Sequence, residues 1–336
     1  MTSPSTQIGP TQVLASYPAE CQPRAIEDLG SAGGFSGARF WRLDTPSGDL
    51  CLRCWPAEHP TAEGLEFIHS VLWYVRQADF DLVPLPLETT QCSSYVRCAS
   101  HLWELAPWMP GKADFAVDSR LEKLRAALVA LAQFHAACDS FALPHNQPTA
   151  APGIVDRRRR LQDLVHGDLE DLRRAVTPGR WPEIELRAQR LFDLFSRAAD
   201  QVVQSLDRAA CVPVLIQPCL RDIWADHVLF EGNQVTGLID FGAMRPDNIA
   251  TDIARLLGSM AGDDRKAWEV GLAAYASVRP ISGAEQLLVD AFDCSSILMS
   301  GLNWLDWIYR QQRTFENARA IPQRLDSQIA RLENLV

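Results

Sequence analysis

The sequence lacks several features that would define its class at once. It has no stretch of about 20 consecutive apolar residues, as a membrane-spanning helix needs, and no early apolar run of signal length. Basic residues are not in surplus, since 32 Lys and Arg stand against 42 Asp and Glu. The net charge of −10 argues against a dedicated nucleic-acid binder. We therefore expect a cytoplasmic protein with no membrane or nucleic-acid partner.

Paired cysteines are also scarce. The nine cysteines are an odd number scattered along the chain, and Cys51 and Cys54 form the only C-x-x-C spacing. That spacing is compatible with a zinc knuckle or a redox pair. The absence of a second pair, and the apolar, strand-like context of Cys51–Cys54, favour free thiols in a reducing compartment.

What is present is typical of a globular protein with two lobes. The chain has 336 residues, of which 47% are apolar and 22% charged. Residues 1–27 are polar and proline-containing, which predicts an irregular arm. A cluster of Pro107, Pro110 and Gly111 predicts a linker, so we expect a sheet-rich lobe over residues 28–107 and a helical lobe over 108–336.

Local patterns give the first lobe its elements. A glycine-rich stretch at 33–37 is followed by two apolar runs, 38–43 and 50–55, and the turn residues at 45–49 between them predict a hairpin. Residues 61–75 place apolar side chains at spacings of three and four, which predicts a helix. Short strands are predicted at 83–87, 94–96 and 102–105.

The second half of the chain is predominantly helical by its periodicity. Helices are predicted over 119–138, 157–175, 184–208 and again from 251 onward, and strands over 212–216, 228–230 and 235–239. Together these elements predict an α+β fold with a small sheet-rich lobe and a larger helical lobe that carries a short sheet.

The most informative segment runs from Leu220 to Asp252. It contains Arg221-Asp222, a strand over 228–230, a turn at 231–234, and a second strand that ends in Asp240-Phe241-Gly242. Asp222 and Asp240 are 18 positions apart, and Asp252 follows Asp240 after 12. This arrangement resembles the H-G-D-x-x-x-x-N loop, hairpin and D-F-G loop of the aminoglycoside phosphotransferase family of phosphotransferase enzymes.

The resemblance implies a protein-kinase-like two-lobed fold that uses ATP and Mg²⁺, with Mn²⁺ as an alternative. Asp222 would be the catalytic base and Asp240 the metal ligand. The chemistry agrees, because phosphoryl transfer needs one carboxylate to orient or deprotonate the attacking hydroxyl and another to hold the metal on the phosphates.

The catalytic loop departs from the family pattern at three positions. Leu220 stands in place of the histidine, Arg221 in place of the glycine, and His227 in place of the asparagine that binds the second metal. Imidazole suits softer metals, whereas magnesium prefers oxygen. We expect either that His227 is a metal ligand or that it only hydrogen-bonds the loop, leaving the metal to Asp240 and Asp226.

The first lobe resembles the family's nucleotide lobe. Gly33, Gly34, Ser36 and Gly37 would let backbone N–H groups approach the triphosphate. The strand that should carry a phosphate-binding lysine has none, and Arg53 takes the matching position. A helix glutamate is expected to pair with it, Glu66 by preference and Glu63 as the alternative. The segment with Glu104 resembles the strand that reads the adenine edge.

Three further features need an interpretation. His166-Gly167-Asp168 spells the family's loop motif, but it lies in a charged helical stretch with no strand after it, and we interpret it as a chance match. His135, at the end of an apolar helix, is interpreted as structural. Trp304 and Trp307 lie three apart on one helix, as core residues or as a stacking wall for a substrate.

Two functions from different classes follow. The first is an ATP-dependent phosphotransferase acting on a hydroxyl of a small molecule. The second is a pseudokinase that binds a nucleotide or a partner without turnover, favoured by the loss of the strand lysine, the loop histidine and the loop asparagine together. A third alternative is a scaffold of the same fold that binds no nucleotide. Retention of both Asp222 and Asp240 favours activity, because a pure scaffold needs neither carboxylate.

Overall fold

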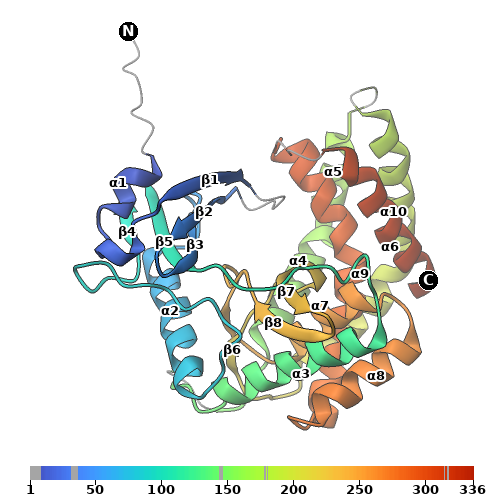
Figure 1. The fold of residues 1–336 in the computed structure, drawn as a ribbon. Helices are drawn as coiled ribbons and strands as arrows, with labels where there is room; N and C mark the ends of the chain where they lie inside the picture. Colours follow the sequence, from blue (N-terminus) through green and yellow to red (C-terminus); the bar gives the residue numbers. More distant parts are fainter. Residues whose placement is uncertain are drawn as a thin grey trace. The chain divides into compact units, whose positions relative to one another are not determined.

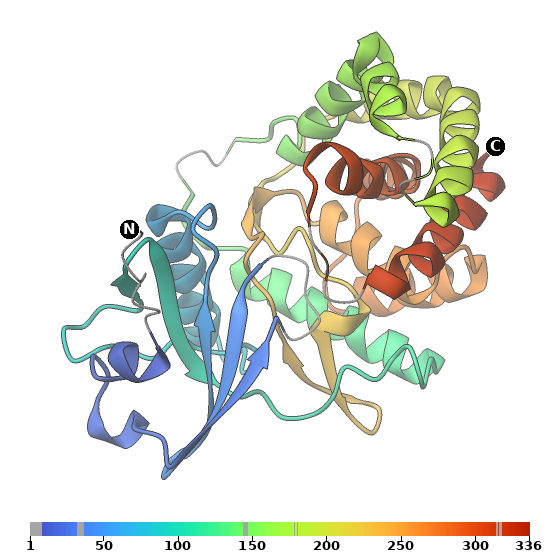
Figure 2. The ribbon, with the colours of Figure 1, turned by 90° about the horizontal axis from the view of Figure 1, so that it is seen from above.

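The computed structural model describes residues 9–31, 37–143, 147–177, 179, 181–313, 315 and 318–336. The chain divides into two units, which Figures 1 and 2 show in two orientations. The first unit contains residues 1–112 and 228–243, and the second contains residues 113–227 and 244–336. The hairpin over 228–243 was expected in the second lobe, but it belongs to the first unit.

The first unit is built on an antiparallel sheet (Figure 2). Within the described residues its strands are β1 (Ala25–Gly30), β2 (Arg39–Thr45), β3 (Gly48–Cys54), β4 (Val96–Cys98) and β5 (His101–Pro107), in the order β1-β2-β3-β5-β4. The predicted hairpin is thus β2 and β3. The predicted helix is α2 (Ala62–Gln77), whose N-terminus is capped by Thr61 Oγ1 accepting from the Gly64 N–H at 3.1 Å.

Each face of this sheet is covered by a helix. On one face lie α1 (Pro10–Leu14) and the short turn η1 (Ala19–Cys21), and the α1 side chains Val13 and Leu14 pack with apolar side chains of β2, β3 and β5. The segment predicted as an irregular arm therefore contributes to the core. On the other face α2 packs through Leu65 against Trp55 and Leu102.

Two predicted strands are absent from the described structure for the same reason. Residues 83–87 run extended beside β5, but Pro84 and Pro86 have no N–H, and the segment makes a single bond to the strand, from Leu87 N to Leu105 O. Residues 212–216 include Pro213 and form only an isolated bridge through Val214. The strand there begins later, as β6 (Gln217–Cys219).

The hairpin of β7 (Val228–Glu231) and β8 (Gln234–Leu238) is joined to the first unit by backbone hydrogen bonds. Lys112 and Phe230 exchange two bonds of 3.0 and 2.9 Å, and Leu238 N donates to Leu82 O at 2.7 Å. These contacts place the Asp240 loop, which follows β8, in the first unit.

The second unit is predominantly helical (Figure 1). Helix α9 packs against α6, α7 and α10, and α3 packs against α8. The pair β6 and β9 (Arg245–Asp247) is antiparallel. No helix in the described parts of the chain is long and apolar enough to cross a membrane. The helices are α3 (Leu121–Cys138), α4 (Pro152–Asp163), α5 (Leu169–Ala175), α6 (Pro182–Ala210), α7 (Ala250–Met260), α8 (Arg265–Ala276), α9 (Gly283–Leu305) and α10 (Ile321–Leu335), with the shorter turns η2 (Leu164–Asp168), η3 (Ala225–His227), η4 (Asp306–Arg310) and η5 (Ala318–Ala320).

Candidate active site

The loop over residues 220–227, which follows β6 in the second unit, is fixed by a buried carboxylate of α7. Asp252 is fully buried and accepts hydrogen bonds from the backbone N–H groups of Leu220 at 2.7 Å and Arg221 at 2.6 Å. A loop so anchored has a defined backbone, and Arg221 adopts a left-handed φ of 63° within it. Such a conformation in a non-glycine residue is costly and is common at functional sites.

A second buried group supports Asp252 from α3. His135 lies 3.0 Å from Asp252 Oδ2 through Nε2, and 2.7 Å from the Tyr275 hydroxyl through Nδ1. Burial lowers the pKa of His135, so the ring is neutral, with Nε2–H donating to the carboxylate and Nδ1 accepting from Tyr275. Each group of the triad has a partner, which agrees with the structural interpretation of His135.

Asp222, the predicted base, extends from this loop with half of its side chain exposed, 51%. Its Oδ1 accepts two hydrogen bonds from Arg255 of α7, at 2.8 Å from Nη2 and 3.1 Å from Nε. Arg255 was not among the predicted residues. The available signal was its position three residues after Asp252, which puts both side chains on one face of a helix.

His227, the predicted second metal ligand, uses both ring nitrogens in hydrogen bonds. Nδ1 donates to the Asp222 carbonyl at 2.9 Å, and Nε2 accepts from the Trp224 indole N–H at 2.7 Å. The neighbouring indole thereby occupies the lone pair that a metal would need. The arrangement favours the alternative in which His227 hydrogen-bonds the loop, and metal ligation by His227 stays a prediction.

Arg221 forms ion pairs with carboxylates outside this loop. Its side chain lies 3.2 Å from the buried Asp247 Oδ2 and 3.4 Å from Asp156 of α4. The guanidinium thus compensates a carboxylate with no exposed surface. Arg221 therefore connects the catalytic loop to β9 and α4.

In the first unit the predicted phosphate-binding cation and metal ligand contact each other. Arg53 Nη2 lies 2.8 Å from Asp240 Oδ1. Asp240 adopts a left-handed φ of 62°, a second strained position in a loop that the sequence singled out. Its carboxylate is 35% exposed, and the Arg53 side chain 9%. The sequence predicted both residues but not this ion pair.

Trp55 completes the surroundings of Arg53. The guanidinium carbon lies 3.4 Å from the Trp55 ring centroid, in cation–π contact. A Cβ added at Gly242 would lie 2.8 Å from the Trp55 ring, which explains why glycine follows Asp240-Phe241. Among the described residues, Arg53 Nε and Trp55 Nε1 are buried donors without an acceptor. Two buried donors without partners are unusual and suit an anionic ligand.

The pairing expected of the helix glutamate is wrong. Arg53 pairs with Asp240, whereas Glu66 accepts from the Tyr95 hydroxyl at 2.9 Å, and Glu63 is an exposed residue in the first turn of α2. A polar α2 residue that does reach the sheet is His69, whose Nε2 lies 2.7 Å from Glu104 Oε2. Apolar neighbours at Leu65, Ile68 and Leu72 make position 69, and not 66, part of the buried face.

A small cavity lies among these residues. Its volume is about 50 Å³, and its lining includes Arg53, Trp55, His69, Glu104 and Asp240. This is room for one or two water molecules. Of the predicted glycine-rich loop, Gly33, Gly34 and Ser36 lie outside the described residues, whereas Gly37 has a left-handed φ of 80°.

The remaining candidate residues lie in surroundings that are typical of structural roles. Burial raises the pKa of the Cys51 thiol to about 12 and of Cys54 to about 11, so both stay protonated, as free thiols. Asp168 of the His-Gly-Asp sequence forms ion pairs with Arg160 and Arg310 and is followed by helix. Trp304 is buried and packs edge-on against Trp307, in accord with a core role.

Known proteins resemble this chain in sequence and in fold. The model of the phosphotransferase enzyme family, APH, matches residues 30–286. The chain belongs to this family. Its fold is the protein-kinase-like fold of the family, with a sheet-rich N-terminal part and a mostly helical C-terminal part.

The three proteins compared next match this chain over a short segment or at low identity. A homoserine kinase of Gluconobacter oxydans (strain 621H) is 37% identical over 93 residues, 26% of this chain and 29% of that protein, so the match spans less than a third of the relative. A microcompartment-associated aminopropanol kinase has a TM-score of 0.65 at 16% identity, over 96% of this chain and 95% of that one. Amicoumacin kinase hAmiN, in complex with AMP-PNP, Ca²⁺ and Ami, has a TM-score of 0.64 at 10% identity, over 92% and 88%.

Proposed function

We propose that this protein transfers the γ-phosphoryl group of ATP to a hydroxyl group of a small molecule. The observation that carries the proposal is the Arg53–Asp240 pair of 2.8 Å, combined with a buried Arg53 Nε that has no acceptor among the described residues. A cation and a carboxylate side by side suit a phosphate and its metal ion, since the phosphate oxygens would accept from the guanidinium.

The first unit offers a carboxylate donor that suits the metal ion. Asp240 would hold Mg²⁺ or Mn²⁺ through carboxylate oxygen, the ligand that magnesium prefers. When bound, the ion neutralises negative charge on the phosphates of the nucleotide. Asp226 offers a further carboxylate in the catalytic loop, and His227 offers a nitrogen only if its bond from Trp224 is broken.

Asp222 supplies the base. Its exposed carboxylate would accept the proton of the acceptor hydroxyl as the oxygen attacks the γ-phosphorus, and ADP would leave with the electron pair of the broken P–O bond. The homoserine and aminopropanol kinases named above both act, by their names, on small molecules that carry an amino group and a hydroxyl group. We therefore propose small hydroxylated amines and amino acids as the first acceptors to examine.

A second candidate function is nucleotide or partner binding without turnover. The engagement of both His227 nitrogens favours it, because a loop whose expected second metal ligand is already hydrogen-bonded can bind a nucleotide without transferring its phosphoryl group. The two functions differ in one respect that is simple to measure, because only the enzyme converts ATP to ADP in the presence of an acceptor.

Mass spectrometry of reactions with ATP and Mg²⁺ or Mn²⁺ tests the proposal. Homoserine, aminopropanol and an aminoglycoside are the acceptors, and we expect a phosphorylated product that contains the γ-phosphoryl group. Asp222→Asn should keep ATP binding and lose product, whereas Asp240→Asn should weaken binding itself. Saturating nucleotide at about 100 times its dissociation constant stabilises a protein by about 2.7 kcal/mol, so binding is read as an upward shift in Tm. ATP binding without product from any acceptor would favour the second candidate.

A further inference from the structure

One face of α7 carries three side chains that contact the catalytic loop. Asp252, Arg255 and Ser259 follow one another at spacings of three and four, so they form a single stripe along the helix. Asp252 binds the backbone of Leu220 and Arg221, and Ser259 Oγ accepts from the Ala225 N–H at 3.0 Å. The stripe thus holds the loop at its beginning and its end, and Arg255 lies between these two contacts.

Arg255 alone in this stripe contacts a side chain of the loop. Both of its hydrogen bonds go to the same oxygen of Asp222, Oδ1, at 2.8 and 3.1 Å. Among the described residues, Asp222 Oδ2 has no hydrogen-bond partner, and the side chain is half exposed. The two oxygens of the predicted base are therefore distinct, because Oδ1 accepts both hydrogen bonds from Arg255 and Oδ2 accepts none from the described residues.

We propose that Arg255 is a positioning residue, which holds Asp222 through Oδ1 so that Oδ2 is presented to the acceptor hydroxyl. The inference rests on the proposed function. During transfer the acceptor O–H proton would move to Oδ2 as the new P–O bond forms and the bond to ADP breaks, and Arg255 would stay on Oδ1 throughout. The proton is released to solvent after the product leaves.

Arginine suits this role better than lysine. A guanidinium is planar, and two of its N–H groups donate to Oδ1 from a fixed edge, which fixes the position of that oxygen and so limits the rotation of the carboxylate. A misplacement of about 1 Å at a reacting group costs about a hundredfold in rate. A residue that fixes the carboxylate plane therefore acts on kcat more than on nucleotide binding.

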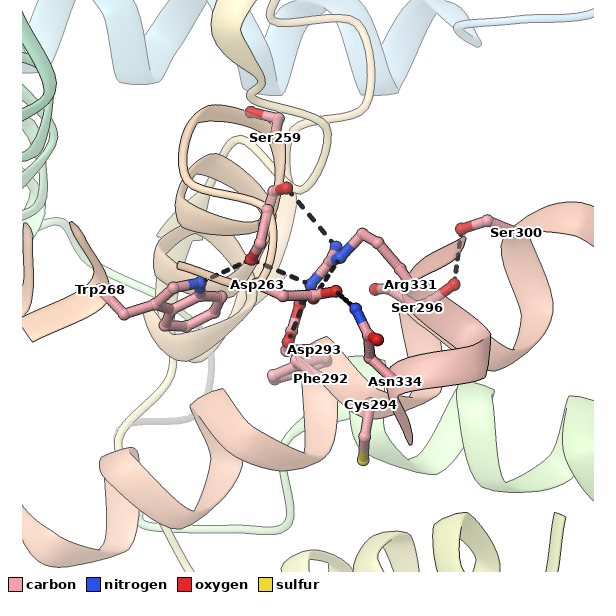
Figure 3. Close-up of polar contacts among 12 residues, drawn as sticks. Ser259, Asp263, Trp268, Phe292, Asp293, Cys294, Ser296, Ser300, Arg331 and Asn334 are labelled. Carbon is pink, nitrogen blue, oxygen red and sulfur yellow. Dashed lines mark hydrogen bonds and ion pairs between the residues drawn. The ribbon is translucent and has the colours of Figure 1, made fainter. Parts of the chain in front are cut away.

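The helix that carries Arg255 is itself held in place by α10. Arg331 donates to the Gly258 carbonyl at 3.4 Å and the Gly262 carbonyl at 3.3 Å, and it pairs with Asp263 and Asp293 at 2.8 and 3.1 Å. Figure 3 shows Arg331 surrounded by these groups at the end of α7. Arg331 thus connects the C-terminal end of α7 to α9 and α10.

Carboxyl labelling tests the ion pair without any need for turnover. The protein is treated at about pH 6 with a carbodiimide and glycinamide, and tandem mass spectra separate Asp222 from Asp226. We expect Asp222 to be labelled several-fold faster in Arg255→Met than in the wild type. The control is Arg190→Met, which removes an equally exposed ion pair of the same unit, between α6 and Glu333 of α10. Equal labelling of Asp222 in wild type and Arg255→Met would overturn the proposal.

Kinetics then test the consequence. In Arg255→Ala we expect kcat with the acceptor to fall about ten- to a hundredfold, with the apparent KM for ATP unchanged. Added guanidinium ion should restore part of kcat in this variant and none in Arg190→Ala, and Arg255→Lys should retain an intermediate rate. A normal kcat in Arg255→Ala would overturn the positioning role. If the wild type never forms product, the proposed function is refuted instead. The presentation of Asp222 to an acceptor is then refuted as well, whereas the labelling still tests the Arg255–Asp222 ion pair.

Discussion

At the scale of single residues, the site depends on which partner each charged group takes. Arg53, Asp222 and Asp240 could be selected as candidates because the residue type and spacing resemble a known motif, and their roles stay predictions. Their partners could not, because Arg53 reaches Asp240 across 187 positions and Asp222 meets Arg255 across 33. Sequence spacing indicates contacts within a helix or hairpin, but it does not indicate which distant element a long side chain will meet.

Arg53 gives the first prediction at this scale. We expect Arg53→Ala to raise the dissociation constant of ATP with Mg²⁺ at least about tenfold, a loss of about 1.4 kcal/mol, because we propose that the buried guanidinium binds the phosphates. Arg53→Lys should restore part of the affinity. Calorimetric titration measures both, and Arg42→Ala, on the neighbouring strand and paired with Asp49, is the control. An unchanged constant in Arg53→Ala would show that the side chain does not bind the nucleotide.

His227 gives the second prediction at the scale of single residues. Since its two nitrogens bond Asp222 and Trp224, we expect His227→Asn to lower turnover by loosening the loop, with the ratio of rates in Mn²⁺ and Mg²⁺ unchanged. Trp224→Phe, which removes the donor to Nε2 and nothing from the metal, should have a similar effect. Turnover is measured with both metals between about pH 5.5 and 8. A shift toward Mg²⁺ in His227→Asn, with a flatter pH profile, would establish the imidazole as a ligand.

At the scale of elements, the sequence predicted most clearly where turn residues and periodicity agree. The hairpin of β2 and β3 and the helix α2, with Thr61 at its N-terminus, are examples. The prediction of a strand at Val83–Leu87 was wrong. The apolar content of the segment suggested a strand, but its prolines lack the N–H donors that a ladder requires. Helix α1 was missed because it is only five residues long and is stabilised by packing of Val13 and Leu14.

The ion pair between Arg331 of α10 and Asp263, in the turn after α7, gives a prediction about pH. Burial alone would raise the pKa of Asp263, but hydrogen bonds from Asn334 and Arg331 outweigh it and hold the pKa below 3.8. A carboxylate with a lowered folded-state pKa stabilises the protein above its unfolded pKa, and this stability is lost as the pH falls through the folded value. We expect the wild type to lose stability below about pH 4 more steeply than Asp263→Asn.

Urea unfolding at pH values from about 3 to 7 measures this difference. Asp290→Asn is the control, because Asp290 is an exposed residue of α9 whose carboxylate has one long hydrogen bond, 3.5 Å from Gln286. Asp293 contributes with the opposite sign, because burial raises its pKa despite Arg331, so its protonation on acidification favours the folded state. Parallel pH curves for wild type and Asp263→Asn would contradict the assignment.

At the scale of the whole molecule, the two units are interleaved in the sequence. The chain enters the second unit after Lys112, returns at Val228 directly after the catalytic loop, and leaves again after Ala243. The catalytic loop and the Asp240 loop are thus connected by a single hairpin, although each belongs to a different unit. The proline and glycine cluster near residue 111 marks the first passage from one unit to the other. It cannot indicate that residues 228–243 belong to the first unit again.

This interleaving predicts how the first unit can be isolated. A fragment of residues 1–112 lacks Asp240 and the hairpin that pairs with Lys112 and Leu82, so we expect it to be poorly folded and not to respond to ATP with Mg²⁺. A single chain that joins Lys112 to Val228 and ends at Ala243 should fold and bind. Lys112 is opposite Phe230 in an antiparallel bridge, so about four glycine and serine residues span the join.

Nuclear magnetic resonance spectra and thermal melts with and without ATP and Mg²⁺ compare the two proteins. The joined protein should show dispersed amide signals and a nucleotide-dependent rise in Tm, and Asp240→Asn in the same protein should remove the rise while the dispersion remains. That variant separates loss of the metal ligand from loss of the fold. A well-folded 1–112 fragment that binds ATP as tightly as the joined protein would show that neither the hairpin nor Asp240 contributes to the nucleotide site.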